Sequence, residues 1–366
     1  MIELCPWKMI PRQAPSKSLF AIIPLITIAC SVLFCTLLFA VQGSDPILAL
    51  YSFFIDPFTS AYNISEILIK ASPLILIAQG LAIGFRAKVW NIGAEGQLII
   101  GAIVASLLPI MWPQSDSAWL LPGMIVAGML GGMAWAAIAA FFRSQFNASE
   151  IIVTLMLNQI ALQILFYLIT GPLRDPHGYG FPQSVVFPDA ALYPLISSGA
   201  GLRANISVFL TIFVTLVLWI FVSKSFAGYR LLVGGLAAKA ARYAGFSASR
   251  GIWTTLLIGG AVAGLAGVGE ISGPIGKLQG ILSPGYGFAA IIVAFLGNLR
   301  PVGIFFAGLF MAVIYVGGDS ATLFADVPAS TPIVFQSSIL VFYMAAYSFV
   351  NYRIVRRHPH GQKEAT

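Results

Sequence analysis

Long apolar runs that contain no charged residue constrain this chain more than any other feature. The first of them, Leu19–Val41, is long enough to cross a bilayer, which takes about 20 predominantly apolar residues. Only 9% of the 366 residues are charged and 58% are hydrophobic. Because a water-soluble globule cannot cover so much apolar surface with polar groups, we expect an all-α, polytopic membrane protein. The same composition excludes a disordered, collagen-like, coiled-coil or disulfide-rich chain.

About ten segments are expected to cross the bilayer. The first apolar run is read as a retained span, because it is longer than the apolar stretch of a signal peptide and is followed by a poor cleavage site. Some later segments are shorter than 20 residues and are expected to continue into Gly-rich segments that lie at membrane depth inside the protein. The ten segments are residues 19–41, 64–85, 97–109, 119–142, 151–170, 206–222, 252–271, 288–299, 302–318 and 333–350.

Charge placement orients these spans. If the N-terminus is inside and the spans alternate, 16 of the 20 Lys and Arg residues fall on the inside, as the positive-inside rule requires. Both termini are then cytoplasmic: residues 1–18 form a basic N-terminus, residues 19–350 the membrane domain and residues 351–366 a basic tail. The net charge of +7 is read as this loop charge and not as a nucleic-acid surface.

Two loops are long enough to have a role. The external loop, residues 171–205, contains five prolines and is expected to form a stiff outer surface. The cytoplasmic loop, residues 223–251, carries five basic residues and no acidic one. Within it, the Ala-rich segment Leu236–Gly245 predicts a helix that is too short to span and that Gly245 can end.

Enzyme and metal signatures are absent from the sequence. The nearest approach to a phosphate-binding P-loop is Gly276-Lys277, which fails because positions 271 and 278 are Ile and Leu. There is no Gly-x-Ser-x-Gly motif of a hydrolase. The cysteines and histidines do not have the spacing of metal ligands, and the cysteines are interpreted as packing residues. These residues are Cys5, Cys30, Cys35, His177, His358 and His360. The chain is therefore expected to be no enzyme and to bind no metal or cofactor.

Several polar residues fall within the expected spans, where a charge costs about 2.5–3.5 kcal/mol on insertion scales. Glu270, near the outer end of its span, either caps a re-entrant turn or lines a solute path. Lys70 lies one helical turn after Glu66, so we expect a structural ion pair between them.

Amides and glycines add two further patterns. Asn158, Gln159 and Gln163 in the fifth span are expected to lie close to one face, where amides either hold helices together or bind a polar solute. The Gly128-x-x-x-Gly132 and Gly260-x-x-x-Gly264 pairs are interpreted as helix-packing sites.

The most distinctive stretch is Asn91-Ile-Gly-Ala-Glu-Gly-Gln97, which follows the basic pair Arg86 and Lys88 and leads into an apolar run. It predicts a capped re-entry into the membrane, with Glu95 in the first turn of the next helix, where the helix dipole favours an acid. A capped re-entry is sufficient to explain the presence of Glu95. It explains the presence of Asn91 and Gln97 less well. All three remain candidates for the solute path.

This stretch resembles the signature of permease subunits of bacterial ABC importers, in the branch that serves nucleosides and simple sugars and is related to the branched-chain amino acid and ribose permeases. Three other stretches resemble the same family: Glu150–Asn158, the external segment Gly171–Pro176 with Pro182-Gln183-Ser184, and Ala240–Gly245. The resemblance extends from about Ala71 to about Ser348.

The resemblance implies a role for the cytoplasmic loop. In such importers a short permease helix docks in a groove of the ATPase, and Ala240-Ala241-x-x-x-Gly245 keeps part of that coupling motif, with Lys239 where the motif has Glu. It implies that Arg242 and Tyr243 take part in this coupling. The alternative is a solvated basic loop beside anionic lipid.

The resemblance further implies a multi-pass subunit of the bacterial inner membrane that forms the pathway for a nucleoside or simple sugar by alternating access. The implied partners are an ABC ATP-binding subunit, which uses ATP and Mg, a periplasmic or lipid-anchored solute-binding protein, and a second related permease, with a heterodimer favoured over a homodimer. A neutral polyhydroxylated solute suits amides better than fixed charges.

Two other functions fit the sequence less well. A stand-alone channel or ion-coupled secondary transporter would place carboxylates near the middle of the membrane, whereas Glu66 and Glu270 are expected near span ends. An intramembrane enzyme would need a paired acid, a histidine cluster or a nucleophile with its base, and none is found in the sequence.

Overall fold

The computed structural model describes residues 7–11, 17–178, 180–196 and 202–356, which form two compact units, Met1–Pro46 with Ser330–Thr366 and Ile47–Ala329. Most of the expected basic N-terminus, residues 1–18, and basic tail, residues 351–366, lies outside the described residues, as does part of the external loop. The predictions on Cys5, His358 and His360 also fall outside them.

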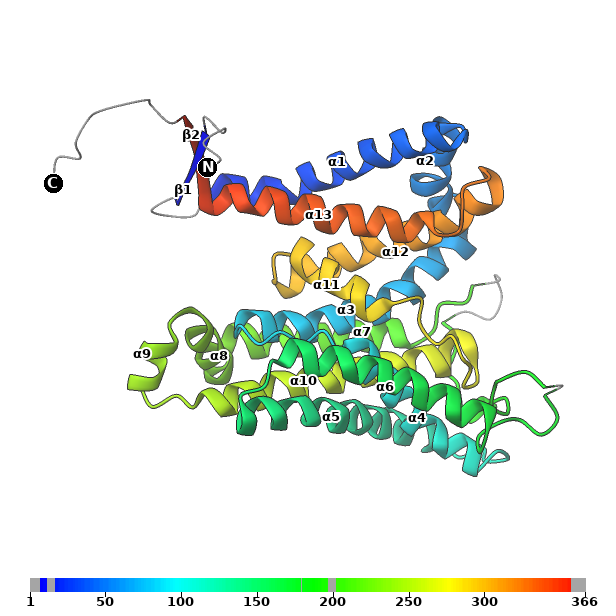
Figure 1. Ribbon diagram of the computed structural model, residues 1–366. Coiled ribbons are helices and arrows are strands. Elements are labelled where there is room, and N and C mark those ends of the chain that lie inside the picture. Colours follow the sequence, from blue (N-terminus) through cyan, green and yellow to red (C-terminus); the bar gives the residue numbers. More distant parts are fainter. Residues whose placement is uncertain (1–6, 12–16, 179, 197–201, 357–366) are drawn as a thin grey trace. The chain divides into compact units, whose positions relative to one another are not determined.

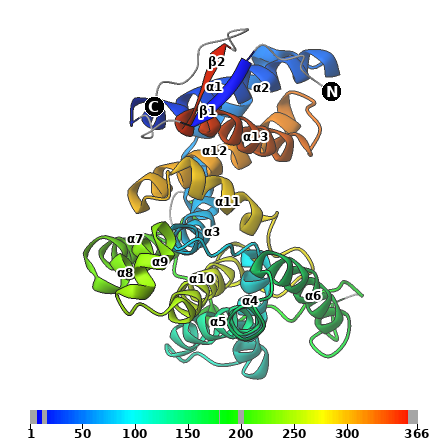
Figure 2. The same cartoon turned by 60° about the vertical axis from the view of Figure 1, so that its left-hand side comes forward.

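The first unit is a helix pair closed by a short ribbon. Helices α1 (Lys17–Gln42) and α13 (Thr331–Asn351) lie side by side in both views (Figures 1 and 2). Strand β1 (Trp7–Pro11) pairs antiparallel with β2 (Tyr352–Arg356), with Trp7 opposite Arg356 and Pro11 opposite Tyr352. Because β1 precedes α1 and β2 follows α13, the strand pairing brings the start of α1 close to the end of α13, as expected if both lie in one compartment.

The second unit contains the remaining helices. They are α2 (Pro46–Phe54), α3 (Ala61–Arg86), α4 (Ala94–Met111), α5 (Leu120–Phe146), α6 (Glu150–Thr170), α7 (Ser207–Lys224), α8 (Phe226–Leu236), α9 (Ala238–Tyr243), α10 (Ala248–Glu270), α11 (Tyr286–Leu296) and α12 (Pro301–Phe324), with 3-10 turns at Asp56–Phe58 and Asp189–Ala191 and a π-helical turn at Ile271–Ile275.

Nine helices in the described residues are long and apolar enough to cross a membrane, and the all-α polytopic class is confirmed. They correspond to nine of the ten expected spans. The exception is the expected span at residues 288–299, which forms the 11-residue helix α11. Eleven helical residues cover about 16 Å, roughly half of the hydrocarbon thickness. The segment before it, residues 276–285, is non-helical.

The core of the second unit is formed where α10 packs between α3 and α5 (Figure 2). Glycines permit this close approach: a Cβ added at Gly132 would overlap the carbonyl oxygen of Gly260, and one added at Gly264 would overlap that of Gly128. The two small-residue pairs predicted from spacing therefore face each other across the α5–α10 contact. Their role in packing is confirmed.

Candidate solute pathway and coupling site

The segment between α3 and α4 enters the protein along α6. The backbone N–H of Trp90 donates to Glu150 Oε1 at 3.4 Å, and that of Ile92 donates to Thr154 Oγ1 at 3.2 Å. Farther along, Asn158 donates from Nδ2 to the Ile92 carbonyl at 2.7 Å and accepts from the Gly96 N–H at 2.8 Å. The eight residue steps from Glu150 to Asn158 cover about 12 Å of helix. Helix α4 therefore begins well inside the unit, as predicted for a capped re-entry.

The amides of this re-entry satisfy one another. Asn91 Nδ2 donates to Gln97 Oε1 at 3.0 Å, and Gln97 Nε2 donates back to Asn91 Oδ1 at 3.2 Å. Asn91 Oδ1 also accepts from the Gly93 N–H at 2.9 Å. Asn91, Gln97 and Asn158 are all buried, so the structure brings three predicted site residues together as a support for the turn.

Glu95 connects the re-entry to the start of α11. Its Oε2 accepts a hydrogen bond from the Gly287 N–H at 2.6 Å. Ser283 caps the same helix end, since its Oγ accepts from the Tyr286 N–H at 2.8 Å. Glu95 itself lies in the first turn of α4, as predicted. The N-terminal ends of α4 and α11, each with the partial positive charge of a helix dipole, therefore meet at one carboxylate.

The other end of α11 is fixed to α3. Arg86 Nε donates to the Leu299 carbonyl at 2.8 Å, and Gln79 Nε2 donates to the Pro301 carbonyl at 2.9 Å. The first bond reaches the turn that joins α11 to α12, and the second reaches the first residue of α12. Helix α11 thus contacts Glu95 at its N-terminal end and lies near Arg86, the last residue of α3, at its C-terminal end.

The three amides of α6 do not share an environment, contrary to the prediction that they lie close to one face. Asn158 is buried against the re-entry, whereas Gln159 and Gln163 are exposed. The reason is the 100° step of the helix, which places a residue's immediate neighbour on a different side. Gln159 and Gln163, one turn apart, form an exposed amide pair.

Glu270 is the last residue of α10 and is 6% exposed. No hydrogen bond or ion pair within the described residues engages its carboxylate. It lines a cavity of about 10 Å³, room for about one water molecule, together with Tyr193 and Ser207. Burial raises the pKa of the Tyr193 phenol well above its ordinary value, so its hydroxyl remains a donor on this cavity.

The predicted pair of Lys70 with Glu66 is wrong. Lys70 Nζ lies 2.5 Å from Asp319 Oδ2 on α12, and Glu66 Oε1 lies 3.0 Å from Arg203 Nη1 in the external loop. Each residue finds an opposite charge on another element, which the spacing within α3 could not indicate. Both residues form ion pairs, so a structural role for them remains the interpretation, but the partners lie on other elements.

The external loop is tied to the segment that precedes α11. The Ser184 N–H donates to the Leu278 carbonyl at 2.8 Å, and Ser184 Oγ accepts from the Leu278 N–H at 2.9 Å. Lys277 Nζ donates to Gln183 Oε1 at 2.8 Å, and the Tyr193 N–H donates to the Ser272 carbonyl at 2.8 Å. Residues 183–193 and 272–278 therefore form one hydrogen-bonded layer.

The predicted short helix of the cytoplasmic loop is α9, which contains Lys239, Ala240, Ala241, Arg242 and Tyr243. Gly245 ends it with a φ of +78°, and the Phe246 N–H donates to the Ala241 carbonyl at 2.9 Å. Only Ala241 of these residues is buried, and Tyr243 is 93% exposed. The helix therefore presents its side chains outward, as a docking element does.

Sequence reasoning missed Gly287 and Ser283, which form the α11 end of the Glu95 contact. A signal was present: Ser283-Pro284-Gly285 precedes an apolar run, which is a helix-start pattern. It also missed Arg143, whose Nε lies 3.1 Å from Glu150 Oε2 and fixes the acid that binds the re-entry. That pair gave no sequence signal, because its members lie on different helices.

Comparison with known proteins gives a family match over most of the chain. Residues 63–344 match the family described as branched-chain amino acid transport system / permease component. The chain is 33% identical over 352 residues to a glucose ABC transporter permease protein of Haloferax volcanii, an alignment that covers 94% of this chain and 92% of that protein.

Two proteins of one organism also match. The guanosine ABC transporter permease proteins NupP and NupQ of Bacillus subtilis are 28% and 25% identical to the chain. The first alignment covers 89% of this chain and 94% of NupP, and the second covers 71% of this chain and 84% of NupQ.

Proposed function

The chain belongs to the family of branched-chain amino acid transport system permease components, and from this premise we propose that it forms the translocation pathway of an importer whose ATP is hydrolysed on a separate subunit. It is a multi-pass membrane protein. The observation that carries the proposal is α9, a short helix that shows five of its six residues to the outside. A protein that transports without a partner has no use for such a projection.

The solute is proposed to be a nucleoside or a simple sugar. The relatives named above are permeases for glucose and guanosine, and both of these solutes carry several hydroxyl groups. Hydroxyls pair with amides and carboxylates. The polar groups that this chain offers for that purpose are Gln159 and Gln163 on the exposed side of α6 and the acids Glu95 and Glu270.

Asn91, Gln97 and Asn158 have a different role in this proposal. Their amide groups bond to each other and to the backbone of the re-entry, so little capacity remains for a solute. They hold Glu95 at the start of α4. The solute path then follows the exposed amide pair of α6 instead of this buried group.

A second, related permease supplies the other half of the path. An exposed amide pair on a spanning helix is expensive against lipid and favours a protein partner or a polar cavity. A heterodimer is favoured because the chain resembles two distinct guanosine permease proteins of one organism. A homodimer is the alternative arrangement.

ATP and Mg bind the partner ATPase, and this chain binds no cofactor of its own. Helix α9 docks on that ATPase through Lys239, Ala240, Arg242 and Tyr243, with Ala241 packed inward and Gly245 ending the helix. Closure of the ATPase moves α9 and thereby shifts the spans between outward-open and inward-open arrangements. The nucleotide cycle supplies the difference in binding free energy that this shift requires.

A solute-binding protein docks on the external loop at the other end of the unit. The hydrogen bonds from Ser184 and Tyr193 to residues 272–278 join this loop to the segment that leads into α11. This segment continues directly into the first turn of α11, which is hydrogen-bonded to Glu95. A displacement of the external loop is therefore transmitted to the re-entry. Half-helices whose N-termini meet inside the membrane are found at transporter binding sites.

The test is co-purification and transport with the Tyr243→Glu variant, using Tyr243→Phe as the matched control. We expect Tyr243→Glu to lose the ATPase or its coupling to uptake, while binding of the solute-binding protein is retained. Tyr243→Phe should behave as the unsubstituted chain. Solute movement by the purified chain without ATP or an ATPase would contradict the proposal and favour a stand-alone secondary transporter.

A further inference from the structure

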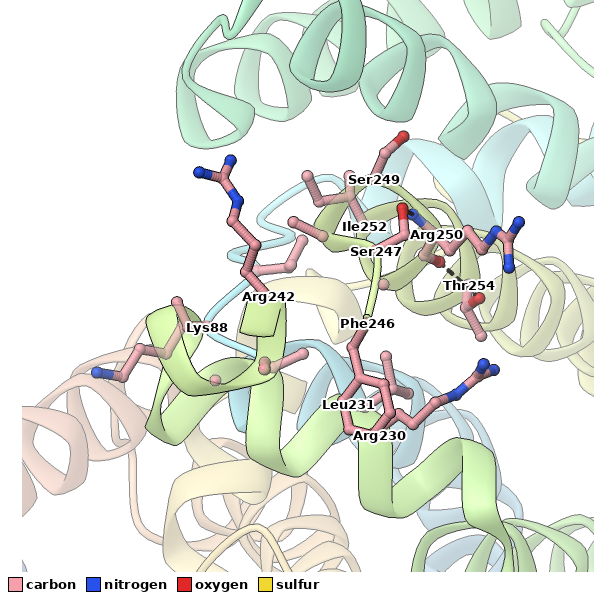
Figure 3. Close-up of a pocket in the computed structure, with 18 of the residues that line it drawn as sticks. Lys88, Arg230, Leu231, Arg242, Phe246, Ser247, Ser249, Arg250, Ile252 and Thr254 are labelled. Atoms are coloured by element: carbon pink, nitrogen blue, oxygen red, sulfur yellow. Dashed lines mark hydrogen bonds between the residues drawn. The ribbon is translucent and has the colours of Figure 1, made fainter. Parts of the chain in front are cut away.

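A large cavity opens at the end of the second unit that carries α8 and α9. It measures about 960 Å³ and is lined by α8, α9, the first turns of α10 and the turn after α3 (Figure 3). The external loop does not border it, and of the re-entry only residues 87–89 and the supporting residues Glu150 and Arg143 do. Its size suits a polar head group and not merely a single ion.

The cavity is strongly basic. Six cationic residues line it, against one acidic residue, Glu150, whose carboxylate is already paired with Arg143. Within the described residues, no ion pair engages the other five cations. These five are Lys88, Arg230, Lys239, Arg242 and Arg250. The cavity therefore holds an excess of positive charge that an anion would neutralise.

Two of these arginines, Arg230 and Arg250, extend in one direction from the cavity lining (Figure 3). The Arg230 guanidinium lies over the Phe226 ring, 5.5 Å from its centroid, and the Phe246 ring meets Phe226 edge-on at 6.0 Å. A cation held over an aromatic face is restricted in position without losing its charge. Arg230 is thus held in place before any ligand binds.

The start of α10 independently favours an anion at the same place. Its first turn carries Arg250 and no acidic residue. A cation at a helix N-terminus opposes the helix dipole, whereas an anion there is stabilised by both the dipole and the free N–H groups. A bound anion beside Arg250 would therefore relieve an unfavourable arrangement in a 23-residue helix.

We infer that this cavity binds a phosphate group, supplied in the membrane by the head group of an anionic phospholipid. Phe226 and Tyr229 are 66% and 56% exposed beside the arginines, and α8 follows directly on the spanning helix α7. Exposed aromatic rings next to basic residues are typical of the membrane–water interface. Basic pockets between spans on the cytoplasmic side bind phospholipid head groups. Arginine suits a phosphate because its planar guanidinium donates two parallel hydrogen bonds.

The experiment uses the full chain purified and placed in nanodiscs of phosphatidylcholine with increasing phosphatidylglycerol. Native mass spectrometry counts the retained lipids for the unsubstituted chain and for Arg230→Gln/Arg250→Gln. The matched control is Lys224→Gln/Arg300→Gln, which removes two exposed basic residues outside the cavity lining. We expect the cavity variant to bind phosphatidylglycerol about thirtyfold more weakly, since each basic residue near an anionic surface contributes about a fivefold gain in affinity. The control should bind as the unsubstituted chain.

Glycerol phosphate in the buffer distinguishes the source of the phosphate. If it displaces phosphatidylglycerol only at concentrations far above those of the lipid, the membrane is the source. If it binds equally well, the site takes a phosphate ester from the cytoplasm, and the assignment of a phosphate site still stands. Equal loss of lipid from both double variants, or from neither, overturns the inference. So does a cavity variant that keeps its lipid but no longer co-purifies with an ATPase, because the cavity then belongs to that partner. Equal melting temperatures in pure phosphatidylcholine exclude misfolding as the cause of a loss.

Discussion

The Glu95 carboxylate accepts a hydrogen bond from the Gly287 N–H at 2.6 Å, across 192 residues of sequence. This contact joins the first turn of α4 to the first turn of α11, the two helices that begin inside the second unit. Along the chain, Glu95 lies next to the hydrogen-bonded amides of the re-entry. Gly287 follows the segment that is hydrogen-bonded to the external loop. The contact is therefore the point at which the re-entry and the outer surface of the unit are connected.

Replacement of Glu95 separates its two possible roles. Glu95→Ala removes the acceptor for the Gly287 N–H, and a hydrogen bond to a charged group contributes about 1.5–3 kcal/mol, so the free energy of unfolding should fall by about that amount. Glu95→Gln keeps an acceptor and should be nearly as stable as the unsubstituted chain. If Glu95 also binds the solute, Glu95→Gln should lose uptake without losing stability. Chemical unfolding in detergent and uptake assays measure the two effects.

Close packing at Gly287 can be tested with an added methyl group. A Cβ there would lie 2.7 Å from Glu95 Cα, so Gly287→Ala must push α11 away from α4. Overpacking of this kind costs about 1–3 kcal/mol. The control is Gly269→Ala on α10, where a Cβ would meet no atom within 4 Å. We expect a lower melting temperature and lost uptake for Gly287→Ala only; equal behaviour of the two variants would contradict the α4–α11 contact.

Neighbouring amides on α6 should respond differently to the same substitution. Asn158→Leu leaves the Gly96 N–H and the Ile92 carbonyl buried without a side-chain partner, at a cost of about 1–3 kcal/mol for each group. The chain should unfold more readily. Gln159→Leu removes an exposed amide, so its stability should be unchanged while uptake falls if the amide pair lines the path. An Asn158→Leu variant of full stability would show that the re-entry does not depend on this side chain.

The layer between the external loop and α11 depends on Ser184. Ser184→Ala removes the acceptor of the buried Leu278 N–H and should free residues 276–285. Hydrogen exchange of that segment is expected to rise, and stimulation of uptake by the solute-binding protein to fall. Ser117→Ala, at an exposed position, is the control. Unchanged exchange at residues 276–285 would mean that the remaining bonds from Lys277 and Tyr193 suffice to hold the layer.

Local sequence signals predicted several features that the structure contains. Nine spans, the short helix α9 and its end at Gly245, and the position of Glu95 in a first turn each depend on residues within about one helix length. The spacing of the glycines indicated that they are packing sites, but only the structure shows that Gly132 and Gly260 face each other. The short segment expected at residues 288–299 corresponds to the 11-residue helix α11, and the segment before it, which contains several glycines, is non-helical and bonded to the external loop.

The partners of the polar residues were beyond such reasoning. Lys70 was assigned to Glu66 at one helical turn, yet it pairs with Asp319, 249 residues away. Asn158 and Gln159 are adjacent in sequence, yet one is buried in the re-entry and the other is exposed. In each case the sequence offers several partners of the same chemical type, and it does not show which of them lies nearby in the fold.

The sequence by itself determined that this chain is a polytopic helical membrane protein of an importer permease family, oriented by its basic loops. Membrane insertion is governed by the sum of residue contributions along each span, so composition and order suffice to predict it. Only the tertiary structure decided that Glu95 meets Gly287, that Lys70 meets Asp319 and that one cavity is lined by five cations that form no ion pair with any described residue. Those outcomes depend on which helix faces approach one another, and that choice is made by packing over the whole unit.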